Sequence, residues 1–375
     1  MRILQTCTRF VPGGIQRHVI DLAGWLRERG HDVTLGGTPG PWSDLADPNF
    51  VPIDVHNVAA EGGPLPRRLV YLARAAAALR PELKRRRIEL IHAHESAPGL
   101  VVGLAAIGTG IPVVLSFHGS NPERIREFGR IGRMVATRLI TPSHRSAEDL
   151  ATIGGVPRDR LHVIGLGIKP VAAPAPEAVA EIRRELLGPD GRILVLTVAR
   201  LAHQKGIDYL VEIVRRVTAA DPAIRFAVVG DGPQRDEARG WAEAAGVADR
   251  LQFLGHSNDP ASYMAAADLF LLPSRWESLP ITIVEAFRQR LPVIATDCGG
   301  VCELVDDSVG RLAQIGDVEA LAGLVLALAH DDALRESLSE TAAARSGEPR
   351  FEPEHIHSLF ERFYGEVLAA RKAGR

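Results

Sequence analysis

Cysteine is scarce in this chain. Its 375 residues include three cysteines, Cys7, Cys298 and Cys302, and no C-x-x-C pair. An odd number of cysteines without metal-ligand spacing excludes a disulfide framework and a structural zinc site. The same scarcity favours a reducing compartment, so we expect a cytoplasmic protein.

A long uninterrupted hydrophobic run is also missing. The first ten residues contain no apolar stretch of the kind found in signal peptides. Residues 96–122 carry no Asp, Glu, Lys or Arg and could in length cross a membrane, but glycine or proline interrupts them at positions 98, 99, 103, 108, 110 and 112. We predict a helix, a turn and a buried strand there, and no integral membrane segment.

Several catalytic motifs are absent as well. There is no G-x-x-x-x-G-K-S/T and no G-x-S-x-G, and Gly230-Asp231-Gly232 lacks the third glycine of G-x-G-x-x-G. These absences argue against a P-loop NTPase, an α/β-hydrolase and a dinucleotide-dependent dehydrogenase.

Charge is divided unevenly along the chain. The net charge is -2, but residues 1–170 hold 22 Lys and Arg against 15 Asp and Glu, a net +7, and the remainder is at -9. A basic half suits an anionic surface or substrate. Because no zinc-finger spacing or aromatic RNA-binding motif accompanies the charge, we do not expect nucleic acid as a partner.

Short β-rich runs alternate with amphipathic helices almost throughout. The expected strands cover residues 3–6, 33–36, 90–94, 113–117, 139–141, 193–198, 224–229, 251–254, 269–272 and 293–296. This alternation is typical of parallel sheets with helices on both faces. A Pro/Ala-rich stretch interrupts the alternation, and we predict a linker there at 170–177. On either side we predict two Rossmann-like α/β domains, at 1–169 and 178–350. A C-terminal helix over 351–375 could pack back on the first domain. Ligands of such sheets bind at the carboxyl ends of the strands, here in a cleft between the two domains.

The segment 273–286 carries the strongest chemical signal. Glu277 and Glu285 stand eight residues apart on either side of a helix start expected at Pro280. Free N–H groups at a helix N-terminus suit an anion such as a diphosphate, and carboxylates accept hydrogen bonds from sugar hydroxyls. Taken alone, such a pair could equally cap a solvated helix.

This segment resembles the signature of glycosyltransferase family four, which comprises retaining, nucleotide-sugar-dependent enzymes with the GT-B fold. Six further motifs occur in the expected order, and the resemblance covers nearly the whole chain. They are Gly13-Gly14 with Arg17, Arg29 to Val33, His118-Gly119, Arg200 with Lys205, Gly230 to Pro233, and Gly299-Gly300 with Glu303. The resemblance implies the GT-B arrangement for the two domains and a transferase activity.

The resemblance also implies the roles of the donor-site residues. Arg200 and Lys205 would hold the donor diphosphate and stabilise the leaving nucleoside diphosphate, and Glu285 would bind the ribose. Lys205 is one of only 4 lysines against 40 arginines, so a compact point charge at this position suggests a purpose. Since this cation pair can replace a metal and the chain has no D-x-D, we expect no metal and no cofactor besides the donor.

The sugar would be held from both domains. Glu277 would position it, with backbone N–H groups around Ser278, Leu279 and Pro280. His118 would meet its hydroxyls from the opposite domain. Gly13 and Gly14 would let the backbone approach the reacting centre.

The acceptor side is less specific. Arg17 follows the first glycine turn. A basic amphipathic stretch follows His118 and contains Arg124, Arg126, Arg130, Arg133 and Arg138. Lys84 to Arg87 form a second basic cluster. These side chains could be a solvated helix face, a contact to an acidic or lipid-pyrophosphate acceptor, or a peripheral contact to anionic lipid on the inner face of the cell membrane.

The function expected is transfer of a sugar from a nucleoside-diphosphate sugar to a hydroxyl of a glycan or lipid-linked acceptor, in cell-surface polysaccharide or glycolipid synthesis. The alternatives are the same chemistry on a soluble small molecule, a nucleotide-sugar 2-epimerase, and a non-catalytic nucleotide-sugar-binding module. The paired cations and glutamates favour a transferase over an epimerase, which would need acid and base carboxylates around the sugar ring.

Overall fold

The computed structural model describes residues 1–375 except 12, 44–48, 60–64, 120 and 374–375. The chain forms two compact units. The first consists of Met1–Gly167 together with Pro353–Arg375, and the second of Ile168–Glu352. The C-terminal segment therefore belongs to the first unit, and the Pro/Ala-rich stretch before helix α8 (Pro176–Leu187) belongs to the second.

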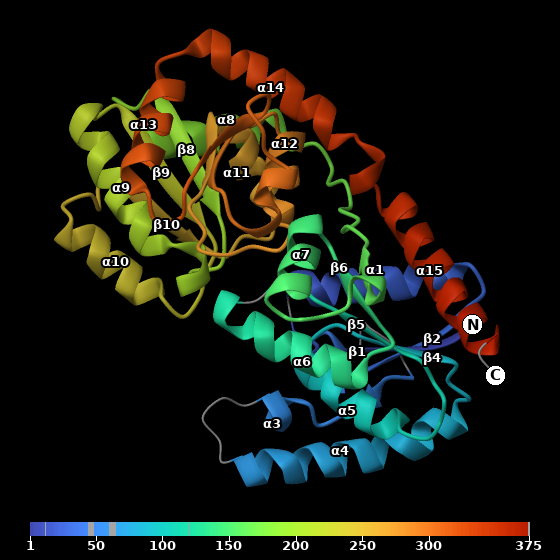
Figure 1. The fold of residues 1–375 in the computed structure, drawn as a ribbon. Helices are drawn as coiled ribbons and strands as arrows, with labels where there is room; N and C mark the ends of the chain where they lie inside the picture. Colours follow the sequence, from blue (N-terminus) through green and yellow to red (C-terminus); the bar gives the residue numbers. More distant parts are fainter. Residues whose placement is uncertain (12, 44–48, 60–64, 120, 374–375) are drawn as a thin grey trace. The chain divides into compact units, whose positions relative to one another are not determined.

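The first unit contains a seven-stranded parallel sheet in the order β3-β2-β1-β4-β5-β6-β7 (Figure 1). Its strands are β1 Arg2–Arg9, β2 Asp32–Thr38, β3 Val51–Pro52, β4 Leu90–Ala93, β5 Val113–Ser116, β6 Arg138–Thr141 and β7 Leu161–Val163. Its helices are α1 Gly14–Glu28, α3 His56–Ala59, α4 Leu65–Arg85, α5 Ser96–Ala106, α6 Ile125–Val135, α7 His144–Thr152 and α15 Pro353–Ala373.

Helices cover both faces of this sheet because successive strand residues point to opposite sides. Ile3 packs with α1 and α15 on one face, whereas Leu4 packs with α4, α5 and α6 on the other. On the first face α15 contributes Phe360 and Tyr364, both fully buried. The C-terminal helix is thus part of the hydrophobic core of the first unit.

The second unit contains a six-stranded parallel sheet in the order β10-β9-β8-β11-β12-β13. Its strands are β8 Ile193–Val198, β9 Ile224–Val229, β10 Leu251–Gly255, β11 Leu269–Leu272, β12 Val293–Thr296 and β13 Gly310–Ala313. Besides α8, its helices are α9 Ile207–Ala220, α10 Arg235–Ala244, α11 Pro260–Ala266, α12 Ile281–Arg288, α13 Val318–Ala329 and α14 Asp332–Ser346. The predicted α/β class, with two Rossmann-like halves, is confirmed.

The strand order reverses once in each sheet. The reversal lies between β1 and β4 in the first unit and between β8 and β11 in the second. Ligands of open parallel sheets bind at the carboxyl ends of the strands flanking such a reversal. Among the described helices, none combines the length and apolar character needed to cross a bilayer.

Candidate functional site

In the second unit, a lysine and a glutamate meet at the reversal between β8 and β11. Lys205 lies in the loop after β8, and Glu277 lies in the loop after β11. The Lys205 Nζ is 2.5 Å from Glu277 Oε1, and the Ser274 hydroxyl donates to the same oxygen at 2.6 Å. The side chains are 17% and 6% exposed. The structure therefore brings together two of the predicted site residues as a largely buried ion pair.

The two loops are fixed against each other by their backbones. The Arg275 N–H donates to the Gln204 carbonyl at 2.7 Å, and the Gln204 side chain donates to the Trp276 carbonyl at 3.0 Å. Gly206 has a φ of 62°, and a Cβ there would lie 2.1 Å from the Pro273 carbonyl oxygen. Only glycine fits this position. The Lys205–Glu277 contact is therefore held by backbone that has little freedom to move.

Arg200 lies two residues beyond the end of β8. It is exposed and has no hydrogen-bonding or ion-pair partner among the described residues. The Gly230–Gly232 turn packs closely against the backbone on either side of Arg200. A Cβ on Gly230 would lie 1.9 Å from the Ala199 carbonyl oxygen, and a Cβ on Gly232 would lie 2.3 Å from the Leu201 carbonyl oxygen. The glycines at this turn thus serve close packing, and the Arg200 guanidinium is left available to a ligand.

Helix α12 carries two polar groups that lack hydrogen-bond partners within the described part of the chain. The Glu285 side chain is partly buried, and this burial raises its pKa above the ordinary range. The nearby Arg288 lowers the pKa, but burial has the larger effect. The Thr282 hydroxyl is buried without a hydrogen bond. The helix begins at Ile281, with Pro280 as an N-cap that supplies no side-chain bond, so the predicted start at Pro280 was one residue early. Ser278 and Pro280 are buried and Leu279 is partly buried.

In the first unit, His118 lies just beyond the carboxyl end of β5 and contacts a second histidine. Its Nε2 is 3.2 Å from the Nδ1 of His94, which is fully buried after β4. Burial lowers the pKa of His118 to about 4, and it holds the pKa of His94 well below the ordinary range. Both rings are therefore neutral near pH 7, and His118 can hydrogen-bond a hydroxyl without carrying charge.

These two rings belong to a larger histidine cluster, which we define as His18, His92, His94, His118 and His357. The Tyr364 hydroxyl is 2.6 Å from His92 Nδ1, and the Ser116 hydroxyl is 2.7 Å from its Nε2. Both ring nitrogens of His18 are buried without a partner among the described residues. Sequence reasoning found only His118. The H-x-H spacing at 92 and 94 was an available signal, because alternate strand residues share a face.

The glycine turn after β1 begins α1. Gly13 is the N-cap, with extended backbone, and a Cβ there would lie 2.5 Å from the Gln16 side-chain oxygen. Gly14 is the first helical residue. Arg17, predicted on the acceptor side, stacks its guanidinium on Trp42 at 5.0 Å from the ring centroid.

Helix α6 has the predicted amphipathic character. Ile125, Phe128 and Ile131 are buried, whereas Arg124, Arg126 and Arg130 are exposed. The Arg133 guanidinium donates to the carbonyls of Gly154 and Gly155 at 3.2 and 2.8 Å. Met134 is 69% exposed and adds an apolar group to the basic face.

The described residues contain no group of three or more His, Cys, Asp or Glu side chains placed to hold a metal ion. The predicted site residues thus form two sets, one at the carboxyl edge of each sheet. In the second unit, Arg200 and Lys205 follow β8, Glu277 follows β11, and Glu285 lies on α12, the next helix. In the first unit, Gly13 and Gly14 follow β1, and His118 follows β5.

Known proteins share this architecture. Two Rossmann-like halves of this kind define the GT-B class of glycosyltransferases. The Anabaena protein Alr3699/HepE, solved in complex with UDP-glucose, superposes on this chain with a TM-score of 0.81. The two are 22% identical, and the match covers 98% of this chain and 100% of that one. The profile described as Glycosyltransferase Family 4 matches residues 12–171, and the profile described as Glycosyl transferases group 1 matches residues 179–345.

Curated relatives extend over most of the chain. The 2-deoxystreptamine N-acetyl-D-glucosaminyltransferase of Streptomyces fradiae is 32% identical over 351 residues, which cover 82% of this chain and 80% of that one. The phosphatidyl-myo-inositol mannosyltransferase of Mycobacterium leprae is 28% identical over 374 residues, which cover 96% and 95%. The chain belongs to glycosyltransferase family 4, as its motifs predicted.

Proposed function

We propose that this glycosyltransferase moves a sugar, with retention of anomeric configuration, from a nucleoside-diphosphate sugar to a hydroxyl of a glycan or lipid-linked acceptor. The observation that carries the proposal is the Lys205–Glu277 ion pair at the β8/β11 reversal, beside an Arg200 with no partner in the described chain. Fixed cations near a departing diphosphate stabilise the charge that develops as the bond to the sugar breaks.

The donor nucleotide is assigned to the second unit. Arg200 and Lys205 hold the diphosphate, and the first N–H groups of α12, which its N-cap Pro280 does not bond through a side chain, add further donors. Glu285 accepts the ribose hydroxyls, which would supply the hydrogen bonds that its carboxylate lacks within the described chain. The UDP-glucose bound in the Anabaena protein supports a nucleotide sugar as the donor class.

Retention is assigned to attack by the acceptor on the same face that the diphosphate leaves. The Glu277 carboxylate already accepts hydrogen bonds from Lys205 and Ser274 through one oxygen, which favours a positioning role over attack on the sugar. The neutral His118 meets the sugar hydroxyls, and Gly13 and Gly14 keep side chains away from the reacting centre.

A panel of uridine, guanosine and adenosine diphosphate sugars tests the reaction. Without acceptor, we expect slow hydrolysis of one donor. With acceptor, we expect a transfer product in which the coupling constant of the anomeric proton, measured by NMR, indicates the same anomeric configuration as in the donor. Inversion at that carbon would contradict the mechanism. Interconversion of the donor sugar without transfer would identify an epimerase.

Two acceptor classes compete, and the relatives' names include both. A glycolipid acceptor is supported by the mannosyltransferase of phosphatidyl-myo-inositol, and a soluble acceptor by the 2-deoxystreptamine enzyme. The exposed Arg124, Arg126 and Arg130 and the exposed Met134 favour the lipid-linked class.

Vesicle sedimentation distinguishes the two classes. Exposed basic residues near an anionic membrane contribute roughly 1 kcal/mol each. We expect salt-sensitive binding to anionic vesicles that is weakened when Arg124, Arg126 and Arg130 are changed together to Gln. Arg133→Gln is not a suitable part of this set, because its guanidinium holds the Gly154–Gly155 backbone. Equal sedimentation with neutral and anionic vesicles, or none with either, would favour a soluble acceptor.

A further inference from the structure

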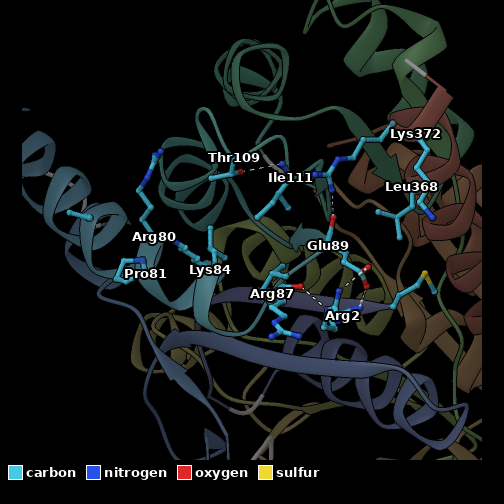
Figure 2. A pocket seen from close by; sticks show the side chains of 15 residues that line it. Arg2, Arg80, Pro81, Lys84, Arg87, Glu89, Thr109, Ile111, Leu368 and Lys372 are labelled. Atoms are coloured by element: carbon cyan, nitrogen blue, oxygen red, sulfur yellow. Dashed lines mark hydrogen bonds and ion pairs between the residues drawn. The ribbon is translucent and has the colours of Figure 1, made fainter. Parts of the chain in front are cut away.

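The first unit contains a cavity that the proposed reaction does not use. Its volume is about 1070 Å³, and it lies at the amino ends of the strands, the opposite edge of the sheet from Gly13 and His118. Met1 and Arg2 begin β1, Glu89 precedes β4 and Ile111 precedes β5. In Figure 2, residues of α4 border the cavity on one side and residues of α15 on the other. The volume is large enough for a drug-sized ligand.

The lining carries a large excess of positive charge. Six of the residues are basic: Arg2, Arg80, Lys84, Arg87, Arg371 and Lys372. The single acidic residue, Glu89, is already engaged, because Arg2 donates to it from its backbone N–H at 2.8 Å and from its guanidinium at 3.2 Å. None of the other five basic side chains has a carboxylate partner among the described residues.

Part of this charge has a structural explanation. Lys84 lies in the last turn of α4, and Arg371 and Lys372 lie in the last turn of α15. Basic residues are favoured there by the helix macrodipole. That account does not extend to Arg87, which lies beyond the end of α4.

Arg87 occupies a position that favours glycine. Its φ is 52°, its N–H donates to the Lys84 carbonyl at 3.1 Å, and the Ile88 N–H donates to the Leu83 carbonyl at 3.0 Å. This is a Schellman helix end, whose left-handed residue is usually glycine because other residues are strained there. An arginine is thus present where glycine would fit the backbone better, which suggests that its guanidinium has a use.

We propose that this cavity binds one molecule of a phosphate-bearing amphiphile. The guanidinium of Arg87, with Lys84 from the last turn of α4, takes the phosphate, since the planar fork of arginine matches phosphate oxygens. The apolar part of the ligand lies along Pro81, Ile111 and Leu368, three of the apolar residues that line the cavity (Figure 2). The site is independent of donor binding in the second unit.

Isothermal titration of the full chain with dihexanoyl phosphatidic acid, below its micelle concentration, tests the proposal. We expect saturable binding of one molecule per chain. Arg87→Gly should weaken it by about tenfold or more, as expected for a lost hydrogen bond between charged groups, while its melting temperature is equal to or above that of the wild type.

The chain offers a matched control. Arg290, in the second unit, has a φ of 61° at the end of α12, where its N–H donates to the Phe287 carbonyl and the Leu291 N–H to the Ala286 carbonyl. Arg290→Gly therefore makes the same backbone change away from the cavity. We expect it to leave phosphatidic acid binding unchanged.

Other outcomes would overturn the proposal. Equal binding by wild type and Arg87→Gly would remove the guanidinium from the site, and equal losses in both glycine variants would show a backbone effect only. Equal affinity for dihexanoyl phosphatidylcholine would show that the unpaired charges do not recognise the ligand. Inorganic phosphate binding as tightly as phosphatidic acid would contradict a role for the apolar wall and identify a free-phosphate site. Donor hydrolysis is measured in a separate assay. The result of that assay tests the proposed transfer reaction, and the titration tests the lipid site.

Discussion

Replacing Lys205 by methionine should damage both stability and turnover, through separable effects. The substitution keeps the length of the side chain but leaves the Glu277 carboxylate, 6% exposed, without its cation at 2.5 Å. Removing one partner of a buried ion pair costs about 3–5 kcal/mol, and because Lys205 is 17% exposed we expect roughly 2–4 kcal/mol. The sequence alone places Arg200 and Lys205 at a strand end and a loop, where substitution should spare the fold; for Lys205, the buried pair with Glu277 changes that expectation.

A second substitution separates the two effects. Glu277→Gln in the Lys205→Met background removes the stranded charge and keeps an oxygen for the Ser274 hydroxyl, so most of the lost stability should return. Turnover should not return. Loss of a charge contact to the leaving group lowers kcat/KM by about a hundredfold or more.

The assays are urea unfolding followed by circular dichroism, and initial rates with the cognate donor. Arg183→Met is a matched control, because Arg183 pairs with Asp268 at 3.1 Å near the amino end of β11, away from the proposed donor site. It should lose stability and keep its turnover. Near-wild-type kcat/KM for Lys205→Met, or recovery of turnover in the double variant, would refute the assignment of Lys205 to the diphosphate.

Three further predictions concern ribose binding, pH and metal. Glu285→Gln should weaken nucleoside diphosphate binding by about 1–3 kcal/mol in calorimetry, through lost charge-assisted hydrogen bonds to ribose; unchanged affinity would remove Glu285 from the nucleotide site. Four members of the histidine cluster, His18, His92, His94 and His118, should make the fold acid-sensitive. Their pKa values are lowered in the folded state, so the unfolded chain binds more protons, and stability should fall by about 1.4 kcal/mol per pH unit for each of these four as the pH drops below 6.5. An unfolding free energy that is flat over this interval would show that the rings are not buried in neutral form. Turnover should persist in excess EDTA, because Arg200 and Lys205 supply the charge for the diphosphate; loss of turnover that magnesium or manganese restores would contradict this.

Much of the fold was predictable because the central strands are largely apolar runs. Strands β8, β9, β11 and β12 have the predicted bounds, and each is buried on both faces. The strands that were missed, β3, β7 and β13, lie at sheet edges, and β3 has only two residues, one of them Pro52. Short edge strands carry too little hydrophobic pattern to be distinguished from loops.

The site was predictable as a set of motifs but not as a set of contacts. The order of motifs placed Lys205 and Glu277 in one site, yet their ion pair joins residues 72 positions apart, and only the β8–β11 pairing brings them together. The histidine cluster depends on α15, which adds His357 from the far end of the chain. Arg133 was grouped with its neighbours by spacing, whereas the fold gives it backbone carbonyls as partners.

The most direct test of the account locates the donor nucleotide on the full chain by hydrogen exchange. Backbone amides of wild-type protein should gain protection with saturating uridine, guanosine or adenosine diphosphate, whichever binds. Our account predicts protection in peptides covering residues 199–206 and 273–286, the loops that hold Arg200, Lys205, Glu277 and the start of α12. Protection confined to residues 1–167, with none in these two loops, would contradict it.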